Sequence, residues 1–325
     1  MPLVEFVGFT CTGKNFNIAF AFFSNEDDGS YTWALNQLAY IYGENAPEVI
    51  MTDRELGLIN AIKVVYPNVN HMLCWVHILR KCQEKALKLT GNLETANKFM
   101  YECRGLLESR SVDSYERRRR GLWARWSHVV DLMSYLDITW LNKHKEKMVR
   151  AWTDTAHHFG TRSTNRVESA HWVLKRTLQS SVGDFGCVFQ AIDLDMVDQI
   201  REVRGSIERN RNTWATDMDG MGIFSRVQHI VSKDCFEHLY KLYEKVIASS
   251  LEPKCRDQFW RVCYGIPCAH DIYQCVQTNT PIMPSQIHKF WKQLKWNGVD
   301  IEDPLDSAPL SSADINIQDF INRFQ

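Results

Sequence analysis

The stretch from Val49 to Arg80 constrains the fold most, because short apolar segments alternate in it with helical patterns. An apolar run at 49–51 ends at Thr52-Asp53, and a second apolar run leads into Cys74-x-x-His77. Between them, apolar residues recur about every three positions until a proline at 67: Leu56, Ile59, Ile62 and Val65. This spacing predicts one buried helix face, which the proline ends. The expected order is strand, carboxylate, helix, strand, Cys/His pair, helix.

Asp53 has two interpretations at this point. In an α/β unit, ligands bind at the carboxyl ends of strands, which is where a metal-binding acid would lie. Thr and Asp are also common N-cap residues, so Asp53 could simply cap the following helix. Local sequence leaves both roles open.

Composition limits the classes of protein to consider. The 325 residues are 45% hydrophobic and 24% charged, as in a globular protein, and they are enough for two domains. A net charge of -1 gives no overall basic field, so any DNA contact must come from local patches. We expect an intracellular, reducing compartment, because the ten cysteines are not arranged as a small secreted framework and no signal peptide or apolar run of membrane length appears.

In chain order, a strand within the first ten residues and a second at 15–23 predict a hairpin, and a helix follows at 33–42 with Ser30 or Thr32 as its cap. After the stretch described above, a helix runs to about residue 90. Three amphipathic patterns, at 93–108, 112–133 and 136–152, then predict an all-helical insertion. Further helices are expected at 185–209 and 225–249. The expected fold class is α/β, a mixed sheet with an antiparallel pair at the front.

Two polar features lie in and after the insertion. Four consecutive arginines beside aromatic residues form either a solvated helix face or a phosphate-binding patch; they are Arg117, Arg118, Arg119 and Arg120. Further on, Ser163, Thr164 or Asn165 can cap a helix whose first turns contain Glu168. That glutamate either complements the helix dipole or faces a metal site.

A loop-rich segment near the C-terminus gathers soft ligands. Its cysteines and histidine suit zinc in number and type, the other interpretation being buried thiols with a surface histidine; the residues are Cys255, Cys263, Cys268 and His270. From residue 301 onward a flexible tail is expected, with a short helix near 317–324.

Several motifs together resemble the Mutator-like (MULE) transposase domain family. They are Thr-Asp-Arg-Glu at 52–55, Leu-Cys-Trp-Val-His at 73–77 and Asn-Arg-Val-Glu-Ser at 165–169. Support comes from the strand pair at 2–8 and 16–22, from Tyr-Thr-Trp-Ala-Leu at 31–35, and from Gly-Ile-Pro-Cys-Ala-His at 265–270, which is similar to a SWIM-type zinc finger. The resemblance covers about residues 2 to 275.

The resemblance implies an RNase H-like fold in which three acids hold two Mg²⁺ ions for DNA cleavage and strand transfer. Carried over by motif, Asp53 is the second acid and Glu168 the third, and both are catalytic and Mg²⁺-binding. Cys74 and His77 support the site, and the arginine run is a DNA-binding candidate. The implied parts are an RNase H-like core at 1–90 and 161–212, a helical insertion at 91–160, a connector at 213–250, a zinc finger at 251–276 and a tail at 277–325.

Two departures from the family pattern matter. No residue matches the first acid or the first strand, since Asp27 and Asp28 follow the hairpin instead. We therefore expect a truncated, catalytically inactive relative that still binds DNA. In the zinc segment, Cys255 and Cys263 stand apart where the family has Cys-x-Cys.

Three functions stay open from the sequence. The first is a transposase-derived DNA-binding protein, the second a domesticated transcriptional regulator like the far-red-impaired-response family, and the third an active transposase with a mispredicted N-terminus. All imply a nuclear protein whose partner is transposon-end or promoter DNA, with Zn²⁺, and Mg²⁺ if the acid set is complete. A homo-oligomer is left open, and neither a membrane nor a small-molecule cofactor is expected.

Overall fold

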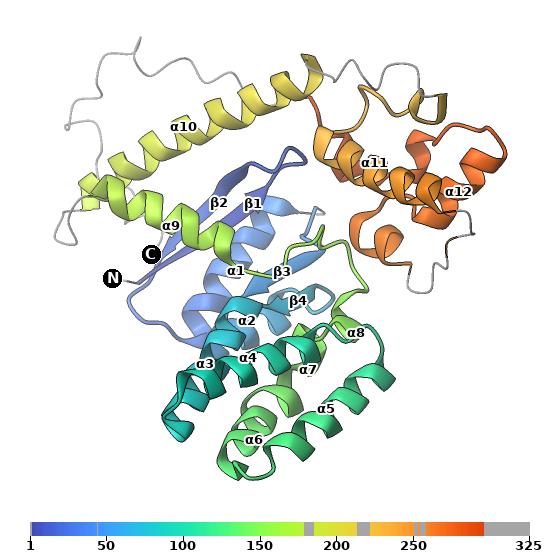
Figure 1. Ribbon diagram of the computed structural model, residues 1–325. Helices are drawn as coiled ribbons and strands as arrows, with labels where there is room; N and C mark the ends of the chain where they lie inside the picture. The colour runs from blue at the N-terminus through green and yellow to red at the C-terminus, as the bar shows by residue number, and fades with distance from the viewer. Residues whose placement is uncertain are drawn as a thin grey trace. The chain divides into compact units, whose positions relative to one another are not determined.

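The structure is a computed structural model that describes residues 2–43, 45–178, 185–212, 222–249, 253 and 258–295. The described residues up to Leu294 belong to one compact unit. They form a mixed α/β protein that is mostly helical (Figure 1). The tail expected from 301 and its short helix lie outside the described residues.

The chain begins with the predicted hairpin. β1 (Leu3–Phe9) pairs antiparallel with β2 (Asn15–Phe22), with a register shift between Phe6 and Val7. Gly13 takes a left-handed φ of 76° in the connecting turn, where glycine meets no Cβ penalty. The next helix, α1 (Asp28–Tyr42), starts earlier than expected. Its cap is Asp27, whose side chain accepts a hydrogen bond from the Ser30 amide at 2.8 Å, so the expected Ser30 or Thr32 cap is wrong.

The constraining stretch folds in the predicted order. β3 (Val49–Thr52), α2 (Leu56–Val65), β4 (Asn70–Leu73) and α3 (Trp75–Thr90) follow one another. β3 and β4 are parallel, with Thr52 opposite Leu73. The pattern of strands 49–52 and 70–73 around a short helix is that of a parallel crossover unit.

The prediction of a single mixed sheet is wrong for the described residues. In the described residues, β1 pairs with β2 and β3 pairs with β4, giving two separate two-stranded sheets. No backbone hydrogen bond joins β1 to β3 in this part of the chain. A cavity, described below, lies between them instead. The hairpin, α1 and α2 share one small core, in which Leu35 and Ile62 are each 1% exposed.

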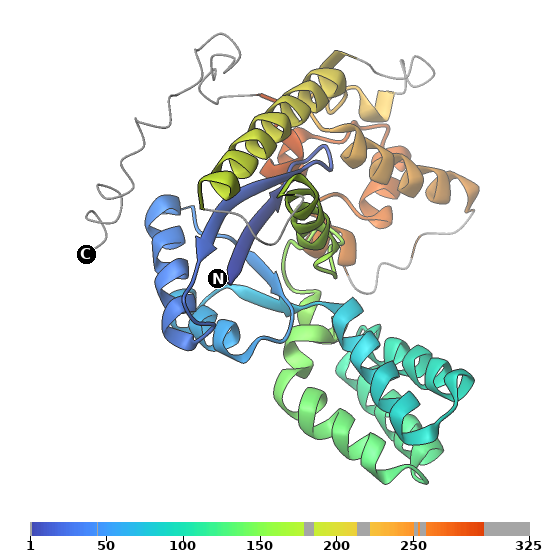
Figure 2. The same cartoon turned by 90° about the vertical axis from the view of Figure 1, so that its left-hand side faces the viewer.

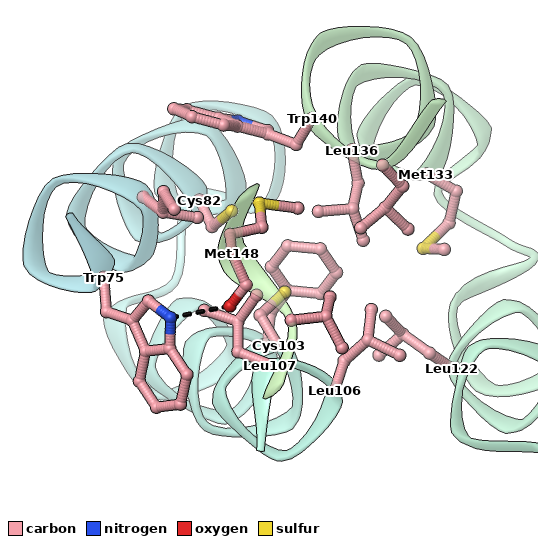
Figure 3. Close-up of a cluster of buried hydrophobic side chains, with 14 of the residues drawn as sticks. Trp75, Cys82, Cys103, Leu106, Leu107, Leu122, Met133, Leu136, Trp140 and Met148 are labelled. Carbon is pink, nitrogen blue, oxygen red and sulfur yellow. Dashed lines mark hydrogen bonds between the residues drawn. The ribbon is translucent and has the colours of Figure 1, made fainter. Parts of the chain in front are cut away.

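The region expected to be an all-helical insertion is helical, but its helices are more broken than expected. After α3 it contains α4 (Leu93–Leu107), α5 (Val112–Trp126), α6 (Val130–Leu136), a π-helical turn η1 (Asp137–Leu141), α7 (Asn142–Met148) and α8 (Arg150–Thr153). The helix expected at 112–133 breaks because Val129 leaves helical geometry, with φ -116° and ψ 67°. Figure 3 shows the core of this region, in which Trp75 donates its indole hydrogen to the Met148 carbonyl at 2.7 Å.

Two long helices cover the hairpin. α9 (Asn165–Leu178) contacts both β1 and β2, and α10 (Phe185–Asn212) contacts β2 and α9. Figure 2 shows both helices lying across the dark-blue hairpin. α9 begins where the sequence predicted, directly after Thr164.

The last described part has its own core. It contains η3 (Gly222–Phe224), α11 (Lys233–Ala248), the π turn η4 (Trp260–Tyr264), α12 (Ala269–Gln277), η5 (Pro284–Gln286) and η6 (Lys289–Lys292). The helix expected from 225 begins only at Lys233, because Ser232 caps it by accepting from the Cys235 amide. Among the described residues, no helix has both the length and the apolar character that crossing a membrane requires.

Candidate functional site at the ends of the parallel strands

The parallel register brings Asp53 and Cys74 to the same edge of the second sheet. Each residue directly follows its strand, and the Cys74 amide donates to the Thr52 carbonyl at 2.8 Å. Asp53 is exposed. It does not cap α2, because the N-cap is Glu55, whose carboxylate accepts from the Gly57 amide at 3.3 Å. The interpretation of Asp53 as a helix cap is therefore wrong, and capping does not explain the position of its carboxylate.

Cys74 and His77 occupy the start of α3. Cys74 is the N-cap and is completely buried, and His77 lies in the first turn. The Thr164 amide donates to the Cys74 sulfur at 3.3 Å, across a sequence separation of 90 residues. The Cys74 sulfur therefore lies at the N-terminus of α3, held from the side of α9 by a backbone amide.

Glu168 joins this pair from α9. Its Oε1 accepts from the Thr164 hydroxyl at 3.1 Å and lies 3.8 Å from His77 Nε2. Ligand atoms of Cys74, His77 and Glu168 all lie within 4.8 Å of one another. The structure therefore brings together three of the four residues that the sequence placed in the core site.

The tautomer of His77 follows from these contacts. Thr164 Oγ1 has one hydrogen, and it points to Glu168. The 3.4 Å contact between Thr164 Oγ1 and His77 Nδ1 therefore needs the hydrogen of Nδ1. In a neutral ring with this tautomer, Nε2 would carry the lone pair on the side of Glu168, as in a metal-binding histidine that is held by a second hydrogen bond.

The donor set decides which metal fits. A thiol sulfur, an imidazole nitrogen and one carboxylate suit zinc or another transition metal, whereas Mg²⁺ prefers oxygen ligands alone. Among the described residues, no group of three or more candidate ligands includes Asp53. The described side chains thus do not fit a two-Mg²⁺ site, and the pairing of Asp53 with Glu168 around Mg²⁺ stays a prediction.

A cavity of about 370 Å³ lies beside this cluster, between β1 and β3. Gly8 lines one side, Met51 the other, and Thr164 and Arg166 the end nearest the cluster. The Arg166 guanidinium stacks 4.6 Å over Phe9 and donates to the Gly13 carbonyl at 3.0 Å.

The structure describes only part of the predicted zinc segment. Cys255 lies outside the described residues. Cys263 and Cys268 are buried, and Cys268 is the N-cap of α12, where its amide donates to Asp271 at 2.8 Å. Cys263, Cys268 and His270 do not form one metal-sized group in the described part of the chain. The zinc ligand set stays a prediction.

Cys263 lies instead near Asp154 and His158. Arg150 and Arg162 both donate to Asp154. Burial works to raise the pKa of this carboxyl, but hydrogen bonds from His158 and Arg162 outweigh it and hold the pKa at about 2. Two arginines already neutralise the aspartate, so we interpret this group as an ion network that joins α8 to the start of α9.

A third group was missed by the sequence analysis. Glu48, His157 and His288 come from three distant segments, and the two imidazole rings stack with centroids 4.4 Å apart. His157 Nδ1 lies 3.1 Å from Glu48 Oε2. His288 Nδ1, however, accepts from the Phe290 amide at 3.2 Å, which leaves Nε2 protonated and unsuited to bind a metal. No local spacing could have revealed this group.

The arginine run is not a uniform surface. Arg119 is partly buried and donates through two nitrogens to Asp137, at 3.2 and 2.9 Å. Arg118 donates to the Gly105 carbonyl. Arg117, Arg118 and Arg120 are exposed. The structural role of Arg119 was not expected, and the exposed three remain candidates for DNA contact.

Comparison with known proteins agrees with the motifs. The profile of the MULE transposase domain matches residues 1–81, which include Asp53, Cys74 and His77. Protein FAR1-RELATED SEQUENCE 5 from Arabidopsis thaliana is 29% identical over 43% of this chain and 17% of its own length. Protein FAR-RED IMPAIRED RESPONSE 1 from the same plant is 22% identical over 58% of this chain and 23% of its own length.

A third relative covers almost all of the chain. It is the PKS-NRPS hybrid synthetase cheA from Chaetomium globosum, 22% identical over 98% of this chain but only 7% of its own length. The chain thus spans less than a quarter of each of these three relatives. Residues 1–81 match the MULE transposase domain, and the chain as a whole is similar to these relatives over part of its length.

Proposed function

We propose that the chain is a transposase-derived DNA-binding protein with an RNase H-like core. The observation that carries the proposal is the convergence of Cys74, His77 and Glu168 beside Asp53, at the carboxyl ends of two parallel strands within and next to the MULE domain. In open α/β folds this edge is where ligands bind. The adjoining cavity supports the same location.

For the metal, we propose Zn²⁺ or a similar ion on Cys74, His77 and Glu168. The lone pair of His77 Nε2 and the amide-supported Cys74 sulfur favour it. A second Zn²⁺, on Cys255, Cys263, Cys268 and His270, remains part of the proposal. Mg²⁺ would need a further carboxylate beside Asp53 and Glu168.

We further propose that this chain by itself binds DNA without cutting it. Glu168 is engaged by Thr164 and His77, and Asp53 has no second carboxylate in a metal-sized group among the described residues. A pair of ions that activates water needs bridging carboxylates.

Two assays on the purified chain test this proposal. Fluorescence anisotropy with terminal-repeat duplex DNA should show salt-dependent binding. A nicking assay with Mg²⁺ or Mn²⁺ should show no cleavage above background. Robust cleavage that Asp53→Ala abolishes, and that the exposed control Asp113→Ala leaves intact, would instead establish an active transposase.

A second candidate is transcriptional regulation, which the similarity to FAR-RED IMPAIRED RESPONSE 1 and FAR1-RELATED SEQUENCE 5 favours. Genome-wide occupancy separates the two. Peaks at single-copy promoters support regulation, and peaks at inverted repeats support a transposon-end binder. Both require the nucleus, which a fluorescent fusion of the full-length protein would check.

A further inference from the structure

A cluster of basic side chains lies where the second sheet meets the helical insertion. Its members come from the β3–α2 loop, α2, β4 and α7; they are Arg54, Lys63, His71, His144 and Lys147. Lys147 Nζ lies 3.3 Å from His71 Nδ1, and His71 Nε2 lies 2.9 Å from Thr52 Oγ1. Thr52 in turn donates to the Asp53 carbonyl at 2.7 Å. A directed chain of hydrogen bonds therefore leads from the cluster to the candidate site.

No ion pair neutralises the cations of the cluster in the described ranges. Asp53 and Glu55 flank Arg54 in the sequence, but no carboxylate pairs with Arg54, Lys63 or Lys147 in this part of the chain. Glu146 acts on Lys147 through its charge, but it is exposed and on the same helix. Like charges held together without a counterion destabilise the folded state, so the arrangement favours an anion.

Burial and the nearby positive charges lower the pKa values of both histidines in the cluster. Burial, then the charges of Lys147, His144 and Lys63, lower the pKa of His71 to about 3. Burial, then Arg54, Lys147 and Lys63, lower the pKa of His144 to about 4. Burial and Lys63 also lower the pKa of Lys147.

The cluster also contains polar atoms that have no partner. His144 is 7% exposed, and neither of its ring nitrogens has a hydrogen-bond partner in the described structure. The same holds for Nε of Arg54, whose guanidinium is fixed 5.1 Å above the Trp140 ring. Unsatisfied buried groups of this kind are costly unless a ligand or water satisfies them. The π turn η1 ends three residues before His144, and such turns often mark functional sites.

We propose that this basic cluster binds a phosphate group, and that on DNA it holds a backbone phosphate beside Asp53. Lys63 is exposed, so the cluster is open to solvent at that end. Lys147 and Arg54 supply charge-assisted donors, and His144 supplies a further donor once an anion is near. The DNA form of this inference rests on the proposed function, whereas phosphate binding itself does not.

Inorganic phosphate is the first probe. Thermal unfolding of the full-length protein is measured in phosphate and in chloride at equal ionic strength, for the wild type, Lys63→Met and Lys147→Met. The control is Lys98→Met, an exposed lysine on α4 in the same insertion. We expect phosphate to raise the wild-type Tm above the chloride value, and both cluster variants to lose most of that rise while Lys98→Met keeps it.

The variants also separate an anion site from a purely structural role. Lys147→Met keeps the apolar stem but removes both one like charge and the hydrogen bond to His71, so its response to phosphate is measured against its own Tm in chloride. The proposal is overturned if phosphate stabilises the wild type no more than chloride does, or if Lys147→Met keeps the wild-type response.

The second probe is duplex DNA, which identifies the source of the phosphate. If the cluster holds a DNA phosphate, Lys147→Met should lower the slope of log affinity against log salt by about 1, while Lys98→Met leaves it unchanged. Loss of the phosphate response with an unchanged slope assigns the site to free phosphate or a nucleotide. If the wild type binds no DNA but keeps its phosphate response, the proposed function fails and the phosphate site stands.

Discussion

Thr164 contributes to the candidate site through both its backbone and its side chain. Its amide donates to the Cys74 sulfur, and its hydroxyl donates to Glu168 while it contacts His77. From the sequence alone, Thr164 was only one of three possible helix caps. Its contacts come from α3 and α9, whose meeting point no local pattern encodes.

If the cluster binds zinc, Thr164→Val should weaken that binding by about 10–100-fold, as loss of an outer partner of a ligating histidine typically does. Valine keeps the shape and the amide but cannot orient His77 or Glu168. The conservative Thr164→Ser should stay within a few-fold of the wild type. Competition with a chromophoric zinc chelator measures both. Equal zinc affinity in all three proteins contradicts a metal role for the cluster.

The two buried histidines of the basic cluster predict an acid-sensitive fold. The pKa of His71 is about 3 and that of His144 about 4 in the folded state, below the ordinary value of 6.5. The unfolded chain therefore binds more protons between about pH 4 and 6.5, so stability is full above pH 6.5 and falls as the pH drops. The loss approaches about 1.4 kcal/mol per pH unit for each histidine.

Urea unfolding from pH 4.5 to 7.5 measures this dependence. In His144→Leu the free energy of unfolding should depend less steeply on pH, because one titrating group is removed. His128→Leu, at an exposed position, should keep the wild-type slope. A wild-type stability that is flat over this range would show that the histidines are not held neutral.

At the scale of elements, the helical insertion depends on one shared core. Phe99 is fully buried in it and packs edge-on against Trp126, with ring centroids 5.0 Å apart. Phe99→Ala should destabilise the protein by about 3–5 kcal/mol, the usual cost of such a cavity. Tyr101→Ala, two residues away and 75% exposed, should change stability by about 0.5 kcal/mol or less. Similar losses for both variants in urea unfolding would contradict this packing.

Local periodicity predicted most elements, and the reasons for its failures are physical. The hairpin, β3, α2, β4, α3 and α9 follow from apolar spacing and turn residues close in sequence. The expected helix at 112–133 failed because Val129 departs from helical geometry, which apolar periodicity does not register. The helix at 136–152 contains a π turn, whose extra residue shifts the register without changing the apolar count.

Contacts between segments that are distant in the sequence were harder to predict than the local elements. The motifs placed Asp53, Cys74, His77 and Glu168 in one site, and the structure gathers the last three. Glu48 with His157 and His288, and the basic cluster around His144, combine residues from distant segments. A single sequence contains no signal for such proximity unless a known motif supplies it.

At the scale of the molecule, the segment from Arg162 to Glu168 joins the two separate sheets. On one side, the Trp75 amide donates to the Arg162 carbonyl at 3.0 Å and Thr164 contacts Cys74. On the other, Arg166 donates to Gly13 and Asn15 in the hairpin turn and stacks on Phe9. No strand pairing joins β1 to β3 in the described residues, so these contacts link the two sheets together with the apolar core that the hairpin shares with α1 and α2.

Arg166→Met should therefore loosen the hairpin without disturbing the parallel pair. The variant loses charge-assisted bonds to the hairpin turn, worth about 1.5–3 kcal/mol. Hydrogen exchange should show amides of β1 and β2 exchanging about tenfold faster or more, while those of β3 and β4 keep their protection. Arg176→Met, an exposed arginine on the same helix that stacks on Trp172, serves as the control and should leave both sheets unchanged. Equal loss of protection in both sheets would mean that they unfold as one unit and that Arg166 does not act as their link.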